Sequence, residues 1–190
     1  MRCETVLRVF SDIPTLSTER LLLRRMAVGD CYDMYEYASN AEVTRFLTWS
    51  PHPDIEYTKE YLQYISNHYR LGDFYDWAVI LKAENKMIGT CGFTRFHMQH
   101  DCGEIGYVIN PAYRGQGIAT EAVGAVMEFG FSRLGLHRIE AKYIDGNAAS
   151  RRVMEKVGMT FEGIRRGEML IKGSYRDIGV CSVLRKDIKI

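Results

Sequence analysis

A glycine-containing loop between a predicted strand and a predicted helix is the part of this 190-residue chain best suited to binding an anion. The loop, Arg114-Gly-Gln-Gly-Ile-Ala119, follows Asn110-Pro111, where proline lacks the backbone N–H that a strand needs. Behind it, apolar residues recur at helical spacing from Ile118 to Leu134. The first N–H groups of a helix attract anions, and glycine lets a ligand approach the backbone closely. The pattern therefore predicts a phosphate site, although such a turn is often only a turn.

Two other nucleotide-binding loops lack essential parts here. No Gly-Lys-Ser/Thr follows the first glycine, as a P-loop for ATP requires. The spacing is also not the Gly-X-Gly-X-X-Gly of a dinucleotide-binding fold. The loop therefore predicts a phosphate site of another kind.

Two ordered motifs resemble the GNAT family of N-acetyltransferases. Arg114, Gly117 and Ala119 match the family's pyrophosphate loop, Gln/Arg-X-X-Gly-X-Gly/Ala, and the segment from Asn147 to Met159 resembles its second coenzyme-binding motif, Asn-X-X-Ser followed by Glu-Lys-X-Gly-Phe. The N-terminal segment from Leu16 to Arg24 is similar to the opening strand of the RimJ/RimL-like branch, which acetylates ribosomal protein N-termini. The resemblance covers about Leu16 to Arg185 and implies acetyl-CoA as cosubstrate.

The resemblance assigns catalytic roles to two side chains. Glu104 lies in the strand that leads to the loop, where similar enzymes have a glutamate that deprotonates the amine, commonly through water. Many relatives protonate the departing thiolate with a tyrosine at the position of Met154, so Ser150 is the predicted substitute. A solvated strand position for Glu104 and a helix cap for Ser150 are the structural alternatives. Because neither motif contains a cysteine, we expect direct attack in a ternary complex.

The expected coenzyme site combines the loop with main-chain groups of the preceding strand. In the family this strand separates from its neighbour and pairs with the pantetheine arm, and one of its amides often stabilises the oxyanion. The predicted cofactor-binding residues are Val108, Ile109, Arg114, Gly115, Gln116, Gly117, Ile118, Ala119, Asn147, Ser150 and Lys156.

The acceptor is expected to be an amine, either a protein N-terminus or a small molecule such as a polyamine, amino acid or antibiotic. Trp49, Tyr35 and Tyr175 are the predicted substrate-binding residues, although aromatic residues at helical spacing are usually core. His97-Met-Gln-His100 falls in a predicted hairpin turn, so we expect no metal site. A non-catalytic acyl-CoA sensor is the alternative function.

Composition is that of one ordinary globular domain, spanning residues 1–190. The chain is 46% hydrophobic and 26% charged with a net charge of +1, which argues against a broad surface for nucleic acid or membrane. No secretory signal, long apolar run or Cys-X-X-Cys pair is present, so we expect a cytoplasmic protein with reduced thiols. Surplus aromatic surface and the resemblance favour a homodimer.

Apolar periodicity predicts the order of elements. Strands are expected at 21–24, 75–81, 87–96, 104–109, 138–144, 160–171 and 175–184, and helices at 30–39, 40–49, 54–71, 118–134 and 148–157. A meander followed by strand, helix and strand predicts an α+β fold. Its sheet is mixed, mostly antiparallel, of about seven strands, with helices on both faces.

Overall fold

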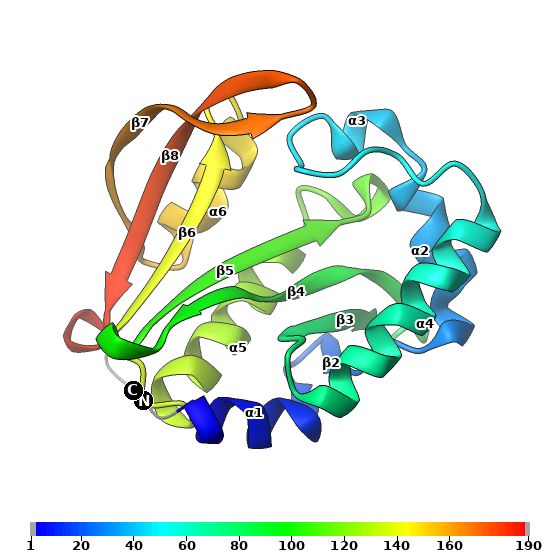
Figure 1. Ribbon diagram of the computed structural model, residues 1–190, viewed down its shortest axis with the longest axis horizontal. Helices are drawn as coiled ribbons and strands as arrows, with labels where there is room; N and C mark the ends of the chain where they lie inside the picture. Colours follow the sequence, from blue (N-terminus) through cyan, green and yellow to red (C-terminus); the bar gives the residue numbers. More distant parts are fainter. Residues whose placement is uncertain (1–2, 189–190) are drawn as a thin grey trace.

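One twisted sheet forms the centre of the computed structural model, which describes residues 3–188 (Figure 1). Its strands lie in the order β1-β2-β3-β4-β5-β6-β8-β7, and only β5 and β6 are parallel neighbours. The bounds are β1 Leu16–Ser17, β2 Leu21–Arg24, β3 Asp76–Leu81, β4 Lys86–His97, β5 Cys102–Ile109, β6 Arg138–Ile144, β7 Thr160–Ile171 and β8 Ser174–Leu184. The mixed, mostly antiparallel α+β sheet is thereby confirmed, with eight strands instead of about seven.

The parallel pair β5 and β6 separates halfway along its length. The two strands are in register from Cys102 and Arg138 as far as Ile105 and Ala141. Beyond that point β5 continues to Ile109 against β4 alone, while β6 continues against β8 (Figure 1). The edge of β5 that faces β6 is therefore unpaired where the strand runs toward the glycine loop.

Helices cover the sheet on two sides. Helix α5 packs against β4 and β5, and α6 packs beside it against β6, β7 and β8; both lie behind the sheet in Figure 1, with α4 in front. Helices α2 and α4 pack on each other, and α2 contacts β4. The helix bounds are α1 Cys3–Ser11, α2 Cys31–Ala38, α3 Ala41–Thr44, α4 Ile55–Leu71, α5 Ile118–Ser132 and α6 Ala148–Lys156.

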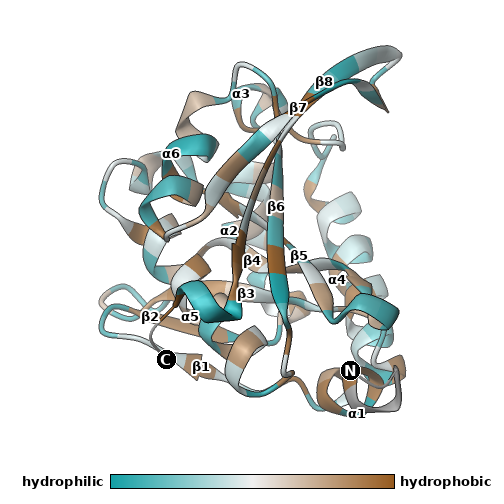
Figure 2. Cartoon of the chain, turned by 90° about the vertical axis from the view of Figure 1, so that its left-hand side faces the viewer, coloured by the Kyte–Doolittle hydropathy of each residue, from teal (hydrophilic) through white to brown (hydrophobic). Residues whose placement is uncertain are grey.

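Local signals explain where the long helices begin and end. The Asp54 carboxylate accepts a hydrogen bond from the N–H of Tyr57 at 2.8 Å and starts α4, and Gly72, at φ 73°, ends it. A Cβ on Gly72 would lie 2.3 Å from the carbonyl oxygen of Leu7, so glycine is required there for packing as well. The β7–β8 turn has Lys172 and Gly173 in the left-handed region, and this hairpin projects from the body of the molecule (Figure 2).

Several elements differ from the sequence-based expectation. Strand β1 and the N-terminal helix α1 were not predicted, and α3 covers only 41–44 of the helix expected at 40–49. In α1, Val6 and Phe10, one turn apart, are fully buried. Asp30, the first residue of the helix expected at 30–39, is the N-cap of α2, and its side chain makes no cap bond. Its carboxylate instead pairs with the guanidinium of Arg24, with N–O distances of 2.7 and 2.8 Å. The buried carboxylate thus joins the end of β2 to the start of α2.

Candidate functional site

A single cleft of about 1310 Å³ opens where β5 and β6 separate. The strands form its floor, the glycine loop and α6 line one end, and the segment from Met34 to Tyr61 lines the other. The hairpin of β7 and β8 reaches across to α3, where the ammonium of Lys172 donates to the carbonyl of Thr44 at 2.6 Å. The cleft is therefore bounded on both sides.

The glycine loop has the geometry of an anion site. Gly115 and Gly117 have φ of 76° and 77°, in the region that only glycine adopts without strain. Gly117 is the N-cap of α5 and supplies no side-chain cap. The first helical bond runs from the N–H of Glu121 to the carbonyl of Gly117, so the N–H groups of residues 118–120 lack helical acceptors. These donors and the helix dipole favour a phosphate at the cleft end of α5.

Arg20 holds this loop to the first turn of α5. Its guanidinium donates to the carbonyl of Gln116 at 2.9 Å and to the carboxylate of Glu121 at 2.7 Å. Glu121 also accepts from the backbone N–H of Arg20 at 2.9 Å. Burial acts to raise the pKa of Glu121, but hydrogen bonds from Thr18 and Arg20 outweigh it and lower the pKa. Sequence reasoning missed this brace because the residues that form it are about 100 positions apart.

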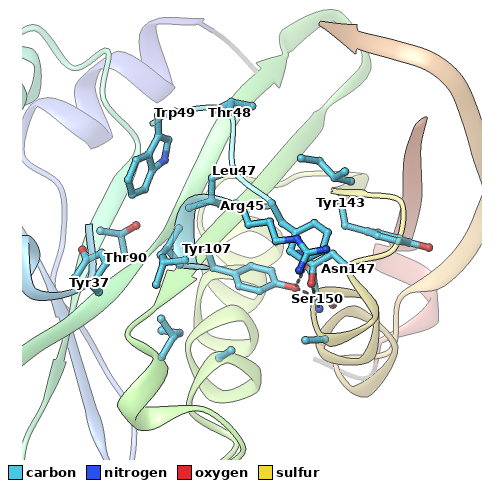
Figure 3. Close-up of a pocket in the computed structure, with 18 of the residues that line it drawn as sticks. Tyr37, Arg45, Leu47, Thr48, Trp49, Thr90, Tyr107, Tyr143, Asn147 and Ser150 are labelled. Atoms are coloured by element: carbon cyan, nitrogen blue, oxygen red, sulfur yellow. Dashed lines mark hydrogen bonds between the residues drawn. The ribbon is translucent and has the colours of Figure 1, made fainter. Parts of the chain in front are cut away.

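Tyr107 and Ser150 form a hydroxyl pair on the wall of the cleft (Figure 3). The two hydroxyl oxygens are 2.9 Å apart, and the phenol oxygen is also 2.9 Å from the carbonyl oxygen of Ser150. Burial raises the pKa of Tyr107, so the phenol stays protonated near neutral pH. The pair can donate a proton, and Ser150 was predicted while Tyr107 was not.

Asn147 and Ser150 lie together at the start of α6. The Asn147 side chain accepts from the N–H of Ser150 at 3.2 Å, which is a helix cap, and both residues line the cleft. Met154, at the position where relatives have tyrosine, is 1% exposed and belongs to the core. The phenol beside Ser150 comes instead from Tyr107 on β5, and the contact between these two residues is visible only in the folded chain.

Glu104 lies at the vertex where the two strands separate. One carboxylate oxygen accepts from the hydroxyl of Thr94 at 3.0 Å. The other is 3.1 Å from the ammonium of Lys142, which comes directly after the last paired residue of β6. That oxygen is buried and has no partner in good hydrogen-bond geometry, so the contact is an ion pair only. The carboxylate therefore retains an unsatisfied acceptor site at the vertex.

The predicted coenzyme-site residues meet at this cleft, with one exception. Val108, Ile109, Arg114, Gly115, Gly117, Ile118, Ala119 and Lys156 line it together with Asn147 and Ser150. Gln116 does not; its amide donates to the carbonyl of Ala112 at 3.3 Å. Arg152 lines the cleft near Lys156, whereas Arg151 pairs with Glu155 at 2.8 Å. Two basic side chains thus accompany the loop at the anionic end.

Of the three residues predicted to bind the acceptor, one lines the cleft and two do not. Trp49 lines the far end of the cleft. Tyr35 does not line it, and its hydroxyl donates to the carbonyl of Pro53 at 3.4 Å. Tyr175 is 74% exposed on the β7–β8 hairpin, also outside the cleft. Helical or strand spacing identifies such aromatic residues but does not say which face they share with the site.

No cluster of three potential metal ligands from His, Cys, Asp and Glu occurs among residues 3–188. His97 and His100 are exposed near the β4–β5 turn. None of the helices described in this range combines the length and the apolar character needed to cross a membrane.

The sequence and fold match known acetyltransferases. Residues 20–160 match the family model described as an acetyltransferase (GNAT) domain. An uncharacterised N-acetyltransferase of Bacillus licheniformis, p20, is 33% identical and aligns over 91% of this chain and 97% of its own length. A GNAT-family acetyltransferase structure from Bacillus anthracis superposes with a TM-score of 0.81 and 31% identity, covering 91% of this chain and 99% of the other.

Two more distant relatives from Escherichia coli have named acceptors. The ribosomal protein uS5-alanine N-acetyltransferase is 27% identical over 88% of this chain and 90% of its own. The spermidine N(1)-acetyltransferase is 25% identical over 85% of this chain and 84% of its own. These relatives use different amines, one on a protein and one on a small molecule.

Proposed function

Since this chain belongs to the GNAT family and is an acetyl-CoA-dependent N-acetyltransferase, we propose that it acetylates a primary amine by direct attack in a ternary complex. The observation that carries the proposal is the separation of β5 from β6 beside the glycine loop. The loop suits the pyrophosphate, and the unpaired edge of β5 suits the amide groups of the pantetheine arm. Coenzyme A would then extend along the cleft with its thioester near the vertex.

Glu104 is the proposed general base, acting through water. Its carboxylate is fixed by Thr94 and Lys142, and its side chain shares the cleft face of β5 with Gly106. A Cβ on Gly106 would lie 2.7 Å from the methyl carbon of Thr94, so glycine there admits the threonine that binds Glu104. As the amine attacks, an amide of Val108 or Ile109 would stabilise the carbonyl oxygen. The thiolate would leave near the Tyr107–Ser150 pair, which supplies the proton.

The thiols support attack without an acetylated enzyme. None of the cysteines in the described part of the chain lines the cleft. Burial also raises the pKa of Cys91, Cys102 and Cys181, which disfavours the nucleophilic thiolate. We therefore propose a single transfer step within the ternary complex.

Two acceptor classes follow from the relatives. The uS5-alanine enzyme supports a protein N-terminal amine, and the spermidine enzyme supports a small amine. A non-catalytic acyl-CoA sensor is the rival function. Glu104 and the hydroxyl pair favour an enzyme, because binding alone needs neither a buried carboxylate at the vertex nor a proton donor opposite it.

The test is release of free thiol from acetyl-CoA with a panel of acceptors. The panel contains a peptide with an N-terminal alanine, the same peptide with that amine blocked, and spermidine. Turnover with an unblocked amine and none with the blocked peptide supports the proposal. Calorimetric binding of coenzyme A without turnover on any amine would establish the sensor instead, and absence of binding would refute the placement of the coenzyme.

A further inference from the structure

Asp76 places a second carboxylate on the cleft face of the sheet, separate from Glu104. Across the sheet Asp76 is in register with Gly92, and Gly92 with Gly106. Residues in register share a face, as do residues two positions apart on one strand, so Asp76 lies on the same face as Glu104. Two strand spacings of about 4.8 Å separate Asp76 from Gly106, and Glu104 lies about 7 Å further along β5, so Asp76 is roughly 12 Å across the floor from Glu104.

The Asp76 carboxylate has hydrogen bonds but no cationic partner among residues 3–188. It accepts from the N–H of Trp77 at 3.0 Å and from the hydroxyl of Thr90. Glu104 at the vertex and Glu121 at the loop each lie within ion-pair distance of a basic side chain. Burial on the cleft floor raises the pKa of Asp76 to about 7, because no counter-ion stabilises the charged carboxylate there.

The walls around Asp76 suit an organic cation. Trp49 and Tyr61 bring aromatic rings to this end of the cleft, and rings attract ammonium groups through their faces. Tyr37, which is 2% exposed, has a buried hydroxyl without a hydrogen-bond partner. Figure 3 shows Tyr37, Thr90 and Trp49 together, away from the Tyr107–Ser150 pair.

Gly92 leaves space beside the Asp76 carboxylate and His52 adds no charge beside it, while Arg45 is a cation that also lines the cleft. A Cβ on Gly92 would come within 2.8 Å of the Asp76 carboxylate oxygen and 2.4 Å of its Cα, so only glycine fits beside it. His52 bonds Thr58 at 2.9 Å, and burial lowers the pKa of His52, so its ring is neutral near pH 7.

We propose that the pocket of Asp76, Thr90 and Tyr37 binds the second ammonium of a small diamine acceptor while its first amine reacts near Glu104. This inference rests on the proposed function and names its substrate class. The contact between Lys172 and Thr44 closes one side of the cleft, which favours a slender, flexible acceptor over a bulky one. The aromatic walls would cover the alkyl chain between the two amines.

The test compares diaminobutane with butylamine, which has the same chain and one amine. We expect the wild-type kcat/KM to favour diaminobutane by about 10- to 100-fold, the worth of one hydrogen-bonded charge pair. Asp76→Asn should reduce this ratio to near one. The matched control is Asp73→Asn, which removes an exposed carboxylate outside the cleft and should preserve the ratio.

A wild-type ratio near one, or a high ratio that survives Asp76→Asn, would overturn the diamine proposal while leaving amine acetylation intact. If no amine or peptide releases thiol, the proposed function fails, and calorimetry then decides the pocket by itself. Diaminobutane titrated into the protein with coenzyme A should bind the wild type and the Asp73→Asn variant but not Asp76→Asn. Equal binding to all of them, or to none, would refute the pocket.

Discussion

Gly117→Ala should separate the conformational role of the loop glycine from its role in admitting the coenzyme. At φ 77°, alanine costs about 1–2 kcal/mol of folding free energy, because its Cβ crowds the carbonyl in the left-handed region. No larger cost is expected, since the added Cβ would meet only a guanidinium nitrogen of Arg20, at 3.5 Å. For a chain of 190 residues this lowers Tm by roughly 2–8 °C.

Gly135→Ala is the matched control. Gly135 has φ 67°, no atom within 4 Å of an added Cβ, and a place in the exposed turn after α5, outside the cleft. Both variants should therefore lose similar stability in calorimetric melting. Only Gly117→Ala should weaken coenzyme A binding, by roughly 10- to 100-fold if one charged hydrogen bond is lost. Titration calorimetry giving the same Kd for both variants would refute the reasoning.

Four further predictions concern the site and the assembly. Glu104→Gln should lower kcat by about 10²- to 10⁴-fold with little change in the Kd of coenzyme A. The loss of kcat should shrink at alkaline pH, where the amine is already deprotonated. A kcat equal to that of wild type across the pH range would exclude Glu104 as the base. Tyr107→Phe should slow thiol release less than Glu104→Gln does, because a thiolate can leave unaided, and a wild-type rate would remove the phenol from the mechanism. The pKa of Asp76 is raised from 3.8 to about 7, so the folded state holds this proton more tightly than the unfolded state, and the stability of the protein falls as pH rises from about 4 to 7. In urea unfolding, Asp76→Asn should therefore be more stable than wild type at about pH 8, by up to about 4 kcal/mol. At about pH 4 the two proteins should have the same stability. Exposed apolar side chains on β7, including Ile164 and Leu170, should support a homodimer, and light scattering at 21.9 kDa would contradict it.

The elements that sequence predicts well are those whose ends carry a local signal. The strand at 138–144 and the helix ended by Gly72 have the expected limits, since apolar period and turn residues act within a few positions. Helix α1 was missed although its sequence is amphipathic and Arg8 lies in its last turn, because a helix this short is identified only with the core that it packs on. Whether a segment forms a helix or a strand is thus decided largely by nearby residues. Which of its faces packs on the core or lines the site is decided by distant ones.

The site shows the same division between local and long-range information. The glycine loop and Asn147 could be identified because each motif is contiguous in the chain. Tyr107 and Asp76 could not, since their roles depend on which helix and which strand lie beside them. Because side chains alternate between the two faces of β5, Tyr107 and Glu104 point to opposite faces of the sheet. The contact of Tyr107 with Ser150 on α6 is what places the phenol on the wall of the cleft.

The gap between β5 and β6 leaves one edge of β5 unpaired, and in the proposed complex the coenzyme would complete the sheet there. Main-chain donors and acceptors left open on β5 are those of a strand edge, a template on which another chain can add. A bound pantetheine arm would cover that edge. By mass action it would also raise the free energy of unfolding by about 2.7 kcal/mol at a ligand concentration 100 times Kd. Resistance to unfolding and to aggregation would then follow the supply of coenzyme A, so the enzyme would last longest where its cosubstrate is plentiful.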